Sequence, residues 1–144
     1  MFRAFENISS LKNVYIGIMT PVCEKHNLTY MELTIIMLLH NNPAHDTASE
    51  IVKLRRLTKS HVSISISSLI EKGYLIGEQS NSDRRTIHLK LTEKAMPIAE
   101  DGMAAQRNFG QIMFKGFSKD EVSVLCGMIE RIAANIVAHE KGQQ

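Results

Sequence analysis

The chain is 144 residues long, which suits one domain, or a domain with an oligomerisation arm, and is enough to bury a substantial core. Its hydrophobic share of 44% and charged share of 22% are those of an ordinary soluble globular protein, and its 2 cysteines exclude a disulfide framework. The N-terminus lacks a signal-peptide core, and we expect no apolar run long enough to span a membrane. A cytoplasmic protein without a membrane partner is therefore predicted.

The net charge of +2 is small, but the charge is unevenly distributed. Residues 47–94 contain nine Lys or Arg against five Asp or Glu, whereas the remainder has eight against ten. A basic excess confined to one segment is what a phosphate-binding surface requires. A solvated charged face is the simpler alternative.

Two helices are predicted before residue 47. The first covers Phe2 to His26, and Pro21 predicts a kink or an early stop near its end. Thr29 and Glu32 have the spacing of a capping box, which predicts a second helix that stops at residues 41–43. The apolar positions at helical spacing are Phe5, Ile8, Leu11, Tyr15, Ile18 and Val22 in the first helix and Leu33, Ile36, Met37 and Leu39 in the second.

Residues 47–72 predict two further short helices. Thr47 and Glu50 form another capping-box pair, and Thr58 is a plausible N-cap for the segment 59–72. Residues 62–67 of that segment alternate between apolar and polar, which is a strand signal. The longer window favours a helix, because Gly73 stands where a helix ends in a left-handed residue and four apolar residues share one helical face, namely Val62, Ile66, Leu69 and Ile70. Ile64 points away from that face.

After Gly73 the apolar period changes to two, which predicts a hairpin of strands 74–78 and 86–91. The intervening turn is polar and basic. Asp83 stands two residues before Arg85, so its carboxylate can hold the guanidinium outward through a charge-assisted hydrogen bond. A guanidinium held on a narrow tip suits the minor groove of DNA.

The chain closes with two predicted helices. Thr92 can cap a long helix that runs through Phe114 and is broken by Gly116, and Ser118 and Glu121 form the capping box of the last helix. The last helix carries a seam whose steps alternate between three and four, formed by Val122, Leu125, Ile129, Ile132 and Ile136. A single chain would leave this seam in water, so we expect two chains to pair through the terminal helices. The alternative is that both ends fold onto one monomer core.

The run from Thr47 to about Ala95 resembles the multiple-antibiotic-resistance regulator (MarR) family of bacterial transcription factors. The resemblance lies in the segments TASEIVKL, LTKSHVS, LIEKGYL and SDRRTIHLKLTEKA, and the DRR element followed by L-x-LTEK is its most specific part. It implies a mainly α fold with a small β-hairpin, an α+β winged helix-turn-helix at residues 29–92. Helical dimerisation arms from both termini, residues 1–28 and 93–144, would complete one compact domain.

The expected function is that of a homodimeric regulator of transcription that binds double-stranded DNA at a palindromic operator, as a repressor released by a small ligand. The predicted phosphate contacts are Arg55, Arg56 and Lys59. Ser60, His61 and Ser63 would read the major groove, and Arg85, steadied by Asp83, would enter the minor groove. Thr58 and Arg84 complete the predicted DNA-binding set. The resemblance also implies a pocket for a small aromatic or phenolic effector, between the dimerisation arms and the DNA-binding region (the reader, residues 29–92). The lining of this pocket is expected to include Tyr15, Met37, Met103 and Arg107.

The sequence predicts no cofactor and no metal site, because His26, His40, His45 and Cys23 lack a compact ligand spacing. No enzyme is expected, since no nucleophile–base arrangement or phosphate-binding Gly loop is recognisable. Cys23 fits a buried structural thiol, and a thiol-based redox sensor is the alternative.

A winged-helix protein-interaction module that does not read DNA is the remaining competitor. An apolar Ile64 on the recognition helix favours that alternative, and the cluster of Arg55, Arg56, Arg84 and Arg85 weighs against it.

Overall fold

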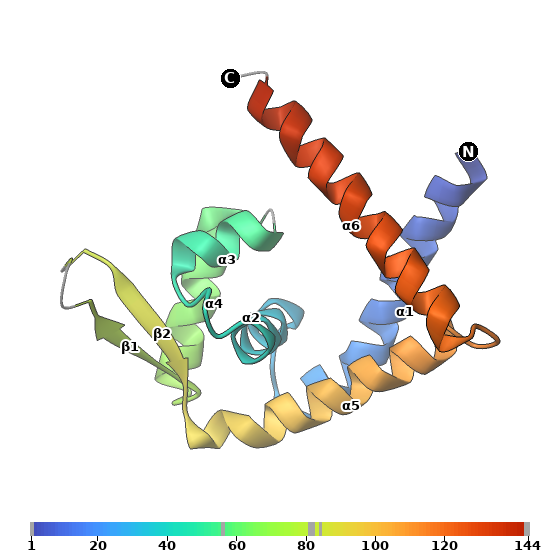
Figure 1. Cartoon of the computed structure of the whole chain (residues 1–144). Coiled ribbons are helices and arrows are strands. Elements are labelled where there is room, and N and C mark those ends of the chain that lie inside the picture. Colours follow the sequence, from blue (N-terminus) through green and yellow to red (C-terminus); the bar gives the residue numbers. More distant parts are fainter. Residues whose placement is uncertain (1, 56, 81–82, 84, 143–144) are drawn as a thin grey trace. The chain divides into compact units, whose positions relative to one another are not determined.

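The computed structural model describes residues 2–55, 57–80, 83 and 85–142, with side-chain surroundings for 10–54, 57–80, 83 and 85–139. Two compact units form, Met1–Phe109 and Gly110–Gln144. Figure 1 shows the elements along the chain. They are α1 (Phe2–His26), α2 (Tyr30–Asn41), α3 (Ala48–Arg55), α4 (Lys59–Glu71), β1 (Leu75–Gln79), β2 (Ile87–Leu91), the 3-10 turn η1 (Glu93–Ala95), α5 (Met96–Met113) and α6 (Lys119–Gly142).

The predicted fold class is confirmed, because the described chain is mainly helical with one antiparallel hairpin. Strands β1 and β2 pair from Leu75 opposite Leu91 to Gln79 opposite Ile87. The loop before α3 adds a second, short pairing, in which Thr47 bridges to His88 and the Leu89 amide donates to the Asp46 carbonyl at 2.8 Å. His88 Nδ1 also lies 2.7 Å from Asp46 Oδ1. The residues that precede α3 are thus hydrogen-bonded to β2, at the base of the wing, which is the β1–β2 hairpin (residues 75–91).

Helix α1 has the predicted bounds and continues through Pro21 to His26, so the early stop, one of the two alternatives that Pro21 predicted, is wrong. Proline removes only its own amide from the helical ladder, and the helix tolerates that loss. The helix ends at His26, the next residue Asn27 is left-handed with φ of 52°, and the Leu28 amide then donates to the Cys23 carbonyl at 2.9 Å. The side chains of Phe5 and Ile8 lie outside the described residues.

The three predicted capping boxes are present. For α2, the Glu32 amide donates to Thr29 Oγ1 at 3.2 Å and the Thr29 amide donates to Glu32 Oε2 at 2.7 Å. The same reciprocal pair opens α3 at Thr47 and Glu50, with donor–acceptor distances of 3.4 and 3.2 Å. It opens α6 at residues 118 and 121, with 3.2 and 2.7 Å. Thr58 occupies the N-cap position of α4, but its side chain makes no capping hydrogen bond.

Residues 59–71 form the helix that the longer apolar window predicts, and Gly73 is left-handed with φ of 77°. Val62, Ile66 and Leu69 are buried, and Ile64 is exposed. The prediction that Ile70 shares the buried face is wrong, because Ile70 lies at the edge of that stripe and is exposed. Ser65 is buried instead.

A buried carboxylate joins α2 to the end of α4. Glu32 is 2% exposed, and it accepts hydrogen bonds from Ser68 Oγ at 2.6 Å and from Lys72 Nζ at 2.9 and 3.0 Å. Burial acts to raise the pKa of the Glu32 carboxyl, but the hydrogen bonds from Ser68, Lys72 and Thr29 outweigh it and hold that pKa below its ordinary value. The ionised side chain therefore links the start of α2 to the end of α4 through hydrogen bonds from Ser68 and Lys72.

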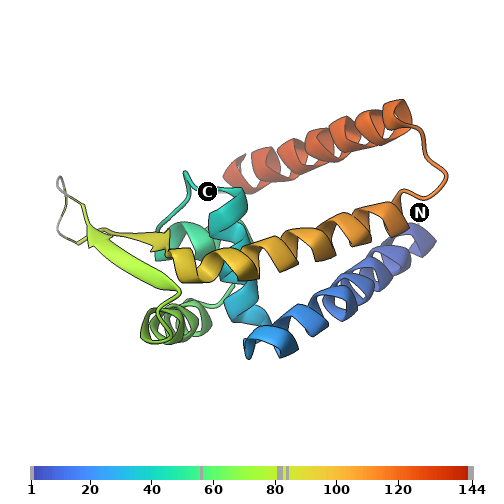
Figure 2. The ribbon, with the colours of Figure 1, turned by 90° about the horizontal axis from the view of Figure 1, so that it is seen from below.

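Helix α5 does not begin at Thr92 as predicted, since the turn η1 precedes it and α5 starts at Met96. Thr92 occupies the N-cap position of η1, but its side chain makes no capping hydrogen bond, and its hydroxyl donates to the Gly73 carbonyl at 2.7 Å. Inside the first unit, α1 and α5 run side by side (Figure 2). Asp101 of α5 accepts from Lys25 at 2.7 Å and lies 2.6 Å from the His26 ring nitrogen.

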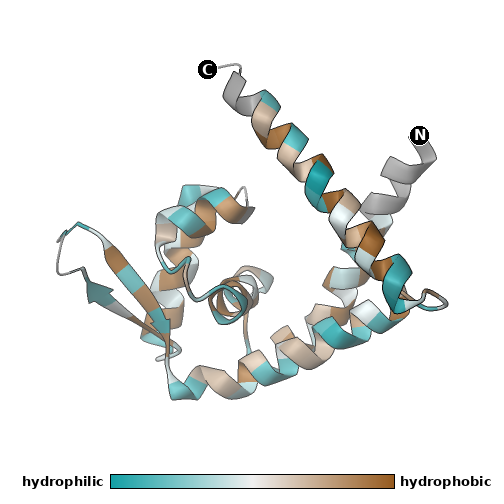
Figure 3. Ribbon diagram, viewed as in Figure 1, coloured by the Kyte–Doolittle hydropathy of each residue, from teal (hydrophilic) through white to brown (hydrophobic). Residues whose placement is uncertain are grey.

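The second unit, Gly110–Gln144, holds the end of α5, a left-handed Gly116 and α6. Large apolar side chains along α6 are exposed, with Ile129 at 55% and Ile132 at 58%. Figure 3 shows hydrophobic and hydrophilic residues interspersed along this helix. The stretch Lys119–His139, with mean hydropathy of 1.3, is long and apolar enough to cross a membrane by length and composition alone. The prediction that no apolar run reaches that length is wrong by this criterion. One such helix is weak evidence for a span, because core helices of soluble proteins pass the same test.

Candidate nucleic-acid interface

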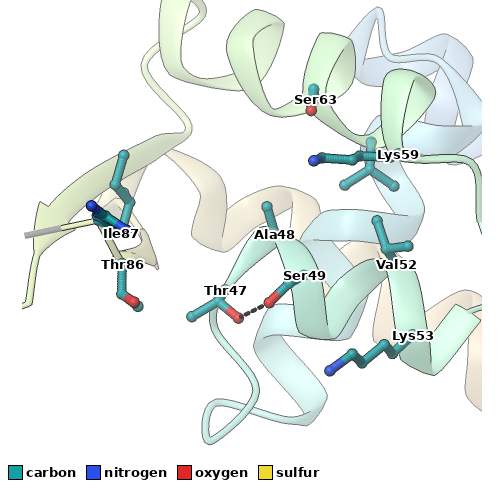
Figure 4. Close-up of a pocket in the computed structure, with 11 residues that line it drawn as sticks. Thr47, Ala48, Ser49, Val52, Lys53, Lys59, Ser63, Thr86 and Ile87 are labelled. Carbon is teal, nitrogen blue, oxygen red and sulfur yellow. Dashed lines mark hydrogen bonds between the residues drawn. The ribbon is translucent and has the colours of Figure 1, made fainter. Parts of the chain in front are cut away.

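A groove of ≈ 470 Å³ lies between α3, the start of α4 and the wing (Figure 4). Figure 4 shows Lys59 and Ser63 of α4 and Ser49 and Lys53 of α3 facing the hairpin residues Thr86 and Ile87 across open space. The complete lining is Thr47, Ala48, Ser49, Val52, Lys53, Lys59, Val62, Ser63, Arg85, Thr86 and Ile87. Three segments that are separate in the sequence therefore form one concave surface.

The groove combines positive charge with hydroxyl groups. Lys53, Lys59 and Arg85 supply one cation from each of the three segments, and none of the lining residues is acidic. Thr47 and Thr86 are among the residues that supply hydroxyls on opposite sides. Cations together with short hydroxyl donors suit the phosphates and base edges of a nucleic acid more closely than an apolar ligand.

Asp83 orders the wing in a way that differs from the prediction. Its Oδ1 accepts from the Arg85 main-chain amide at 2.9 Å, and its Oδ2 accepts from the Thr86 hydroxyl at 2.9 Å. The amide of Arg85, followed by the Thr86 hydroxyl, holds the pKa of the Asp83 carboxyl below its ordinary value. Asp83 therefore stabilises the backbone turn that carries Arg85, and its carboxylate accepts from the Arg85 main-chain amide and not from the guanidinium.

The start of α4 presents the predicted reading residues to solvent. Thr58, Ser60, His61 and Ser63 are all exposed, and Ser63 also lines the groove. The structure brings Lys59, Ser63 and Arg85 together as expected. Arg56 and Arg84 lie outside the described residues, and only the main chain of Arg55 is described.

Two residues on α3, Ser49 and Lys53, also line the groove, although they were not among the predicted DNA-binding residues. They stand four apart on the short helix that the Thr47 capping box opens, and so they share one helical face. That spacing was visible in the sequence. Their position opposite the hairpin was not, because it depends on the pairing of residues 46 and 47 with β2.

The expected effector-pocket residues do not form one site. Tyr15 and Met37 line a hollow of ≈ 20 Å³ between α1 and α2, together with Met19, Tyr30, Leu33 and Thr34. Met103 does not line this hollow, and its sulfur lies 3.2 Å from the His40 ring nitrogen. Arg107 is exposed on α5 and lies outside the hollow as well. The hollow is smaller than a bound aromatic molecule requires.

Cys23 is buried in the core of the first unit. Burial, followed by smaller contributions that include the nearby Glu24 and Glu32, raises the pKa of the Cys23 thiol above its ordinary value. A raised pKa lowers the thiolate fraction on which redox reactivity depends. Cys126 on α6 is exposed. Among the described residues, no group of three or more His, Cys, Asp or Glu side chains could hold a metal ion.

Residues 26–86 match the model of the MarR family, and solved structures of similar fold span nearly the whole chain. A MarR transcriptional regulator from Methanosarcina mazei Go1 has 18% identity and a TM-score of 0.80, covering 96% of this chain and 99% of that one. A MarR-family protein from Listeria monocytogenes, complexed with 26mer DNA, has 16% identity and a TM-score of 0.76, covering 96% and 90%. BpsR of Bordetella bronchiseptica, whose DNA binding is regulated by 6-hydroxynicotinic acid, has 15% identity and a TM-score of 0.70, covering 91% and 98%.

The helix pair α3–α4 followed by the β1–β2 hairpin defines the class of the protein, a winged helix-turn-helix protein. The family model covers this region from the end of α1 to the wing. Over residues 26–86 the chain is similar to the MarR family, and solved structures of the same fold include transcriptional regulators of that family.

Proposed function

We propose that this protein is a sequence-specific transcriptional regulator that binds double-stranded DNA as a homodimer at a palindromic operator. Helix α4 enters the major groove with Ser60, His61 and Ser63 toward the bases, and Arg85 enters the adjacent minor groove. Lys59, with the sequence-predicted Arg55 and Arg56, neutralises phosphates, and Thr58 and the sequence-predicted Arg84 complete the proposed set of DNA contacts. A cytoplasmic location follows from this role.

The observation that carries the proposal is the groove between α3, α4 and the wing. Its three cations come from three separate segments, and no carboxylate is among the residues that line it. A duplex presents phosphates on both sides of each groove, so a protein that spans one groove must offer cations on both sides of its reading helix. Lys53 and Lys59 supply them from the helices and Arg85 supplies one from the wing.

Dimerisation follows from the exposed apolar side chains of α6, for which we propose a second copy of the chain as the partner. The arms, residues 1–28 and 93–144, would hold two copies of the reader, residues 29–92. A symmetric pair also presents two reading helices to half-sites about one DNA turn apart, which a palindromic operator provides.

A small aromatic or phenolic effector that releases a repressor completes the proposal. Its support is the regulation of BpsR of Bordetella bronchiseptica by 6-hydroxynicotinic acid. The hollow beside Tyr15 and Met37 would have to widen to admit such a molecule. Met103 and Arg107 remain proposed lining residues for that widened state.

Salt dependence tests the proposed function directly. If about five phosphates are neutralised per dimer, log affinity for a random-sequence duplex falls linearly with log salt with a slope of about −4 to −5. Lys59→Ala is expected to make the slope shallower by up to about two, since a dimer loses two contacts. Fluorescence anisotropy at several salt concentrations measures both slopes. A slope near zero would contradict DNA binding.

The alternative of a protein-interaction module is favoured by one observation, the exposed Ile64 on α4. Such a module gains nothing from cations placed to match phosphates, so it predicts no salt-dependent complex with duplex DNA. A redox sensor that uses Cys23 is disfavoured, because burial raises the pKa of that thiol.

Arg85→Ala is expected to weaken binding to the selected operator by about 1–3 kcal/mol per half-site, with a larger loss at narrow A·T-rich flanks than at G·C-rich ones. The melting temperature should stay nearly unchanged, because Arg85 is exposed. Electrophoretic mobility shifts measure the affinity and circular dichroism measures the melting.

Lys90→Ala is the matched control for this substitution, because Lys90 is a cation of the same hairpin and is already paired with Glu78 at 2.6 Å. Asp83→Ala should give a smaller loss than Arg85→Ala, since Asp83 orders only the backbone of the turn. If the Arg85→Ala protein bound as tightly as the Lys90→Ala protein, the wing would have no part in binding.

A further inference from the structure

The outward face of α4 is apolar at its centre. Val62, Ile66 and Leu69 form the buried stripe, and a helical step of about 100° per residue places Ile64 almost directly opposite that stripe. Ile64 is 68% exposed. Ser60 and Ser67 lie on either side of it along the same face, four residues before and three residues after, and both are exposed.

The charge around Ile64 indicates which partner covers it. No carboxylate occurs between Lys59 and Ile70 on α4, and Lys53, Lys59 and Arg85 line the groove beside this face. A protein partner that docked on an exposed isoleucine would have no need of this cationic border. Duplex DNA requires it, because both phosphate backbones flank the helix that enters the major groove.

The polar residues on this face cannot specify most bases strongly. Guanine is read by a bidentate Arg or Lys and adenine by a bidentate Asn or Gln, yet α4 carries none of these four types after Lys59. Serine and histidine donate or accept single hydrogen bonds and tolerate several bases. The apolar side chain of Ile64 has one matching feature in the major groove, which is the C5-methyl group of thymine. At any other base, the Ile64 side chain would displace water from polar atoms of the base edge and offer no hydrogen bond in return, which costs free energy.

We infer that Ile64 contacts the C5-methyl group of one thymine in each half-site and thereby selects thymine at that position. This inference rests on the proposed function, because it assumes that α4 lies in the major groove. It adds the base that the helix recognises and the side chain that recognises it.

The experiment removes only the methyl group. Duplexes are first enriched from a random library by the full-length protein, and the bound sequence is then prepared with deoxyuridine scattered in place of thymidine. Bound and free fractions are separated and cleaved at uracil. For the wild-type protein we expect uracil to be depleted from the bound fraction at one thymine in each half-site. For Ile64→Ala we expect the depletion at that thymine to vanish while the rest of the pattern stays.

Affinities for the pure substituted operator give the magnitude. Loss of one buried methyl group is expected to weaken wild-type binding about fourfold per half-site, or about fifteenfold per dimer, and to change Ile64→Ala binding less than about twofold. Ile70→Ala is the matched control, since Ile70 is an exposed isoleucine on another face of the same helix. It should keep the wild-type sensitivity to uracil.

The outcomes separate the two hypotheses. A protein that forms no retarded complex with any duplex overturns the proposed function, and this inference with it. A protein that binds duplexes but enriches no sequence, or shows no thymine at which uracil interferes, overturns the thymine contact alone. The same holds if Ile64→Ala keeps the wild-type interference pattern.

Discussion

Replacing Ile129 and Ile132 together by Asp is expected to dissociate the proposed dimer and to lower operator affinity by about 10²–10⁴-fold. The two side chains are 55% and 58% exposed on α6, so the substitutions do not disturb the core of a single chain. In a paired helix they would bury two uncompensated carboxylates per chain. The loss of affinity follows because a monomer engages one half-site without the gain from linking two. Multi-angle light scattering at micromolar concentration gives the mass.

Ser123→Asp combined with Ala134→Asp is the control for this variant, because it adds the same charge to the opposite side of α6. It should remain dimeric and bind normally. A protein with Asp at positions 129 and 132 that still had a dimer mass would exclude α6 as the interface.

Lys72→Met is expected to lower the free energy of unfolding by about 2–3 kcal/mol at pH 7. It leaves the Glu32 carboxylate buried without its cation, and only the Ser68 hydroxyl and the Thr29 main-chain amide still donate hydrogen bonds to the charge. The effect should fall below that of a fully buried pair, because the Lys72 side chain is 34% exposed. Urea denaturation followed by circular dichroism measures it.

The pH dependence of the Lys72→Met deficit has a definite sign. The pKa of Glu32 is lowered in the folded protein, so its contribution to stability is present above the unfolded value of about 4.3 and is lost as pH falls through the lower folded value. The difference between wild type and Lys72→Met should therefore be full at pH 7 and shrink toward pH 3. A difference that grew on acidification would contradict the ion pair.

Lys25→Met provides the matched comparison for Lys72→Met. Lys25 pairs with Asp101 at 2.7 Å but its side chain is largely exposed, so the loss should be about 0–1 kcal/mol. A second substitution, Glu32→Gln, made in the Lys72→Met protein should restore part of the stability, because it removes the uncompensated charge.

Most of the helices and the hairpin could be predicted from local patterns in the sequence. Capping boxes depend on side chains three residues apart, so Thr29 with Glu32 and Thr47 with Glu50 could be recognised without tertiary structure. The helix at residues 59–71 could be separated from a strand by the spacing of Val62, Ile66 and Leu69, all of which are buried.

Contacts between distant residues could not be predicted in the same way. The Thr92 hydroxyl looked like a helix cap, but it donates to the carbonyl of Gly73, 19 residues earlier. Glu32 and Lys72 are 40 residues apart, and nothing in the sequence marks them as partners. Asp83 had the right spacing to reach Arg85, yet spacing does not tell whether a carboxylate takes the amide or the guanidinium. The groove could not be predicted either, because it forms only where the hairpin faces α3 in the folded chain.

The pairing of residues 46 and 47 with β2 has a mechanical consequence. Main-chain hydrogen bonds join the entrance of α3 to β2, and this pairing restrains movement of the hairpin relative to α3. In the proposed complex the distance from Lys59 to Arg85 would then be set by the protein, and DNA with an unsuitable groove width would have to deform to meet both residues. Selection between binding sites can thus act through the stiffness of the duplex, at base pairs that no side chain touches.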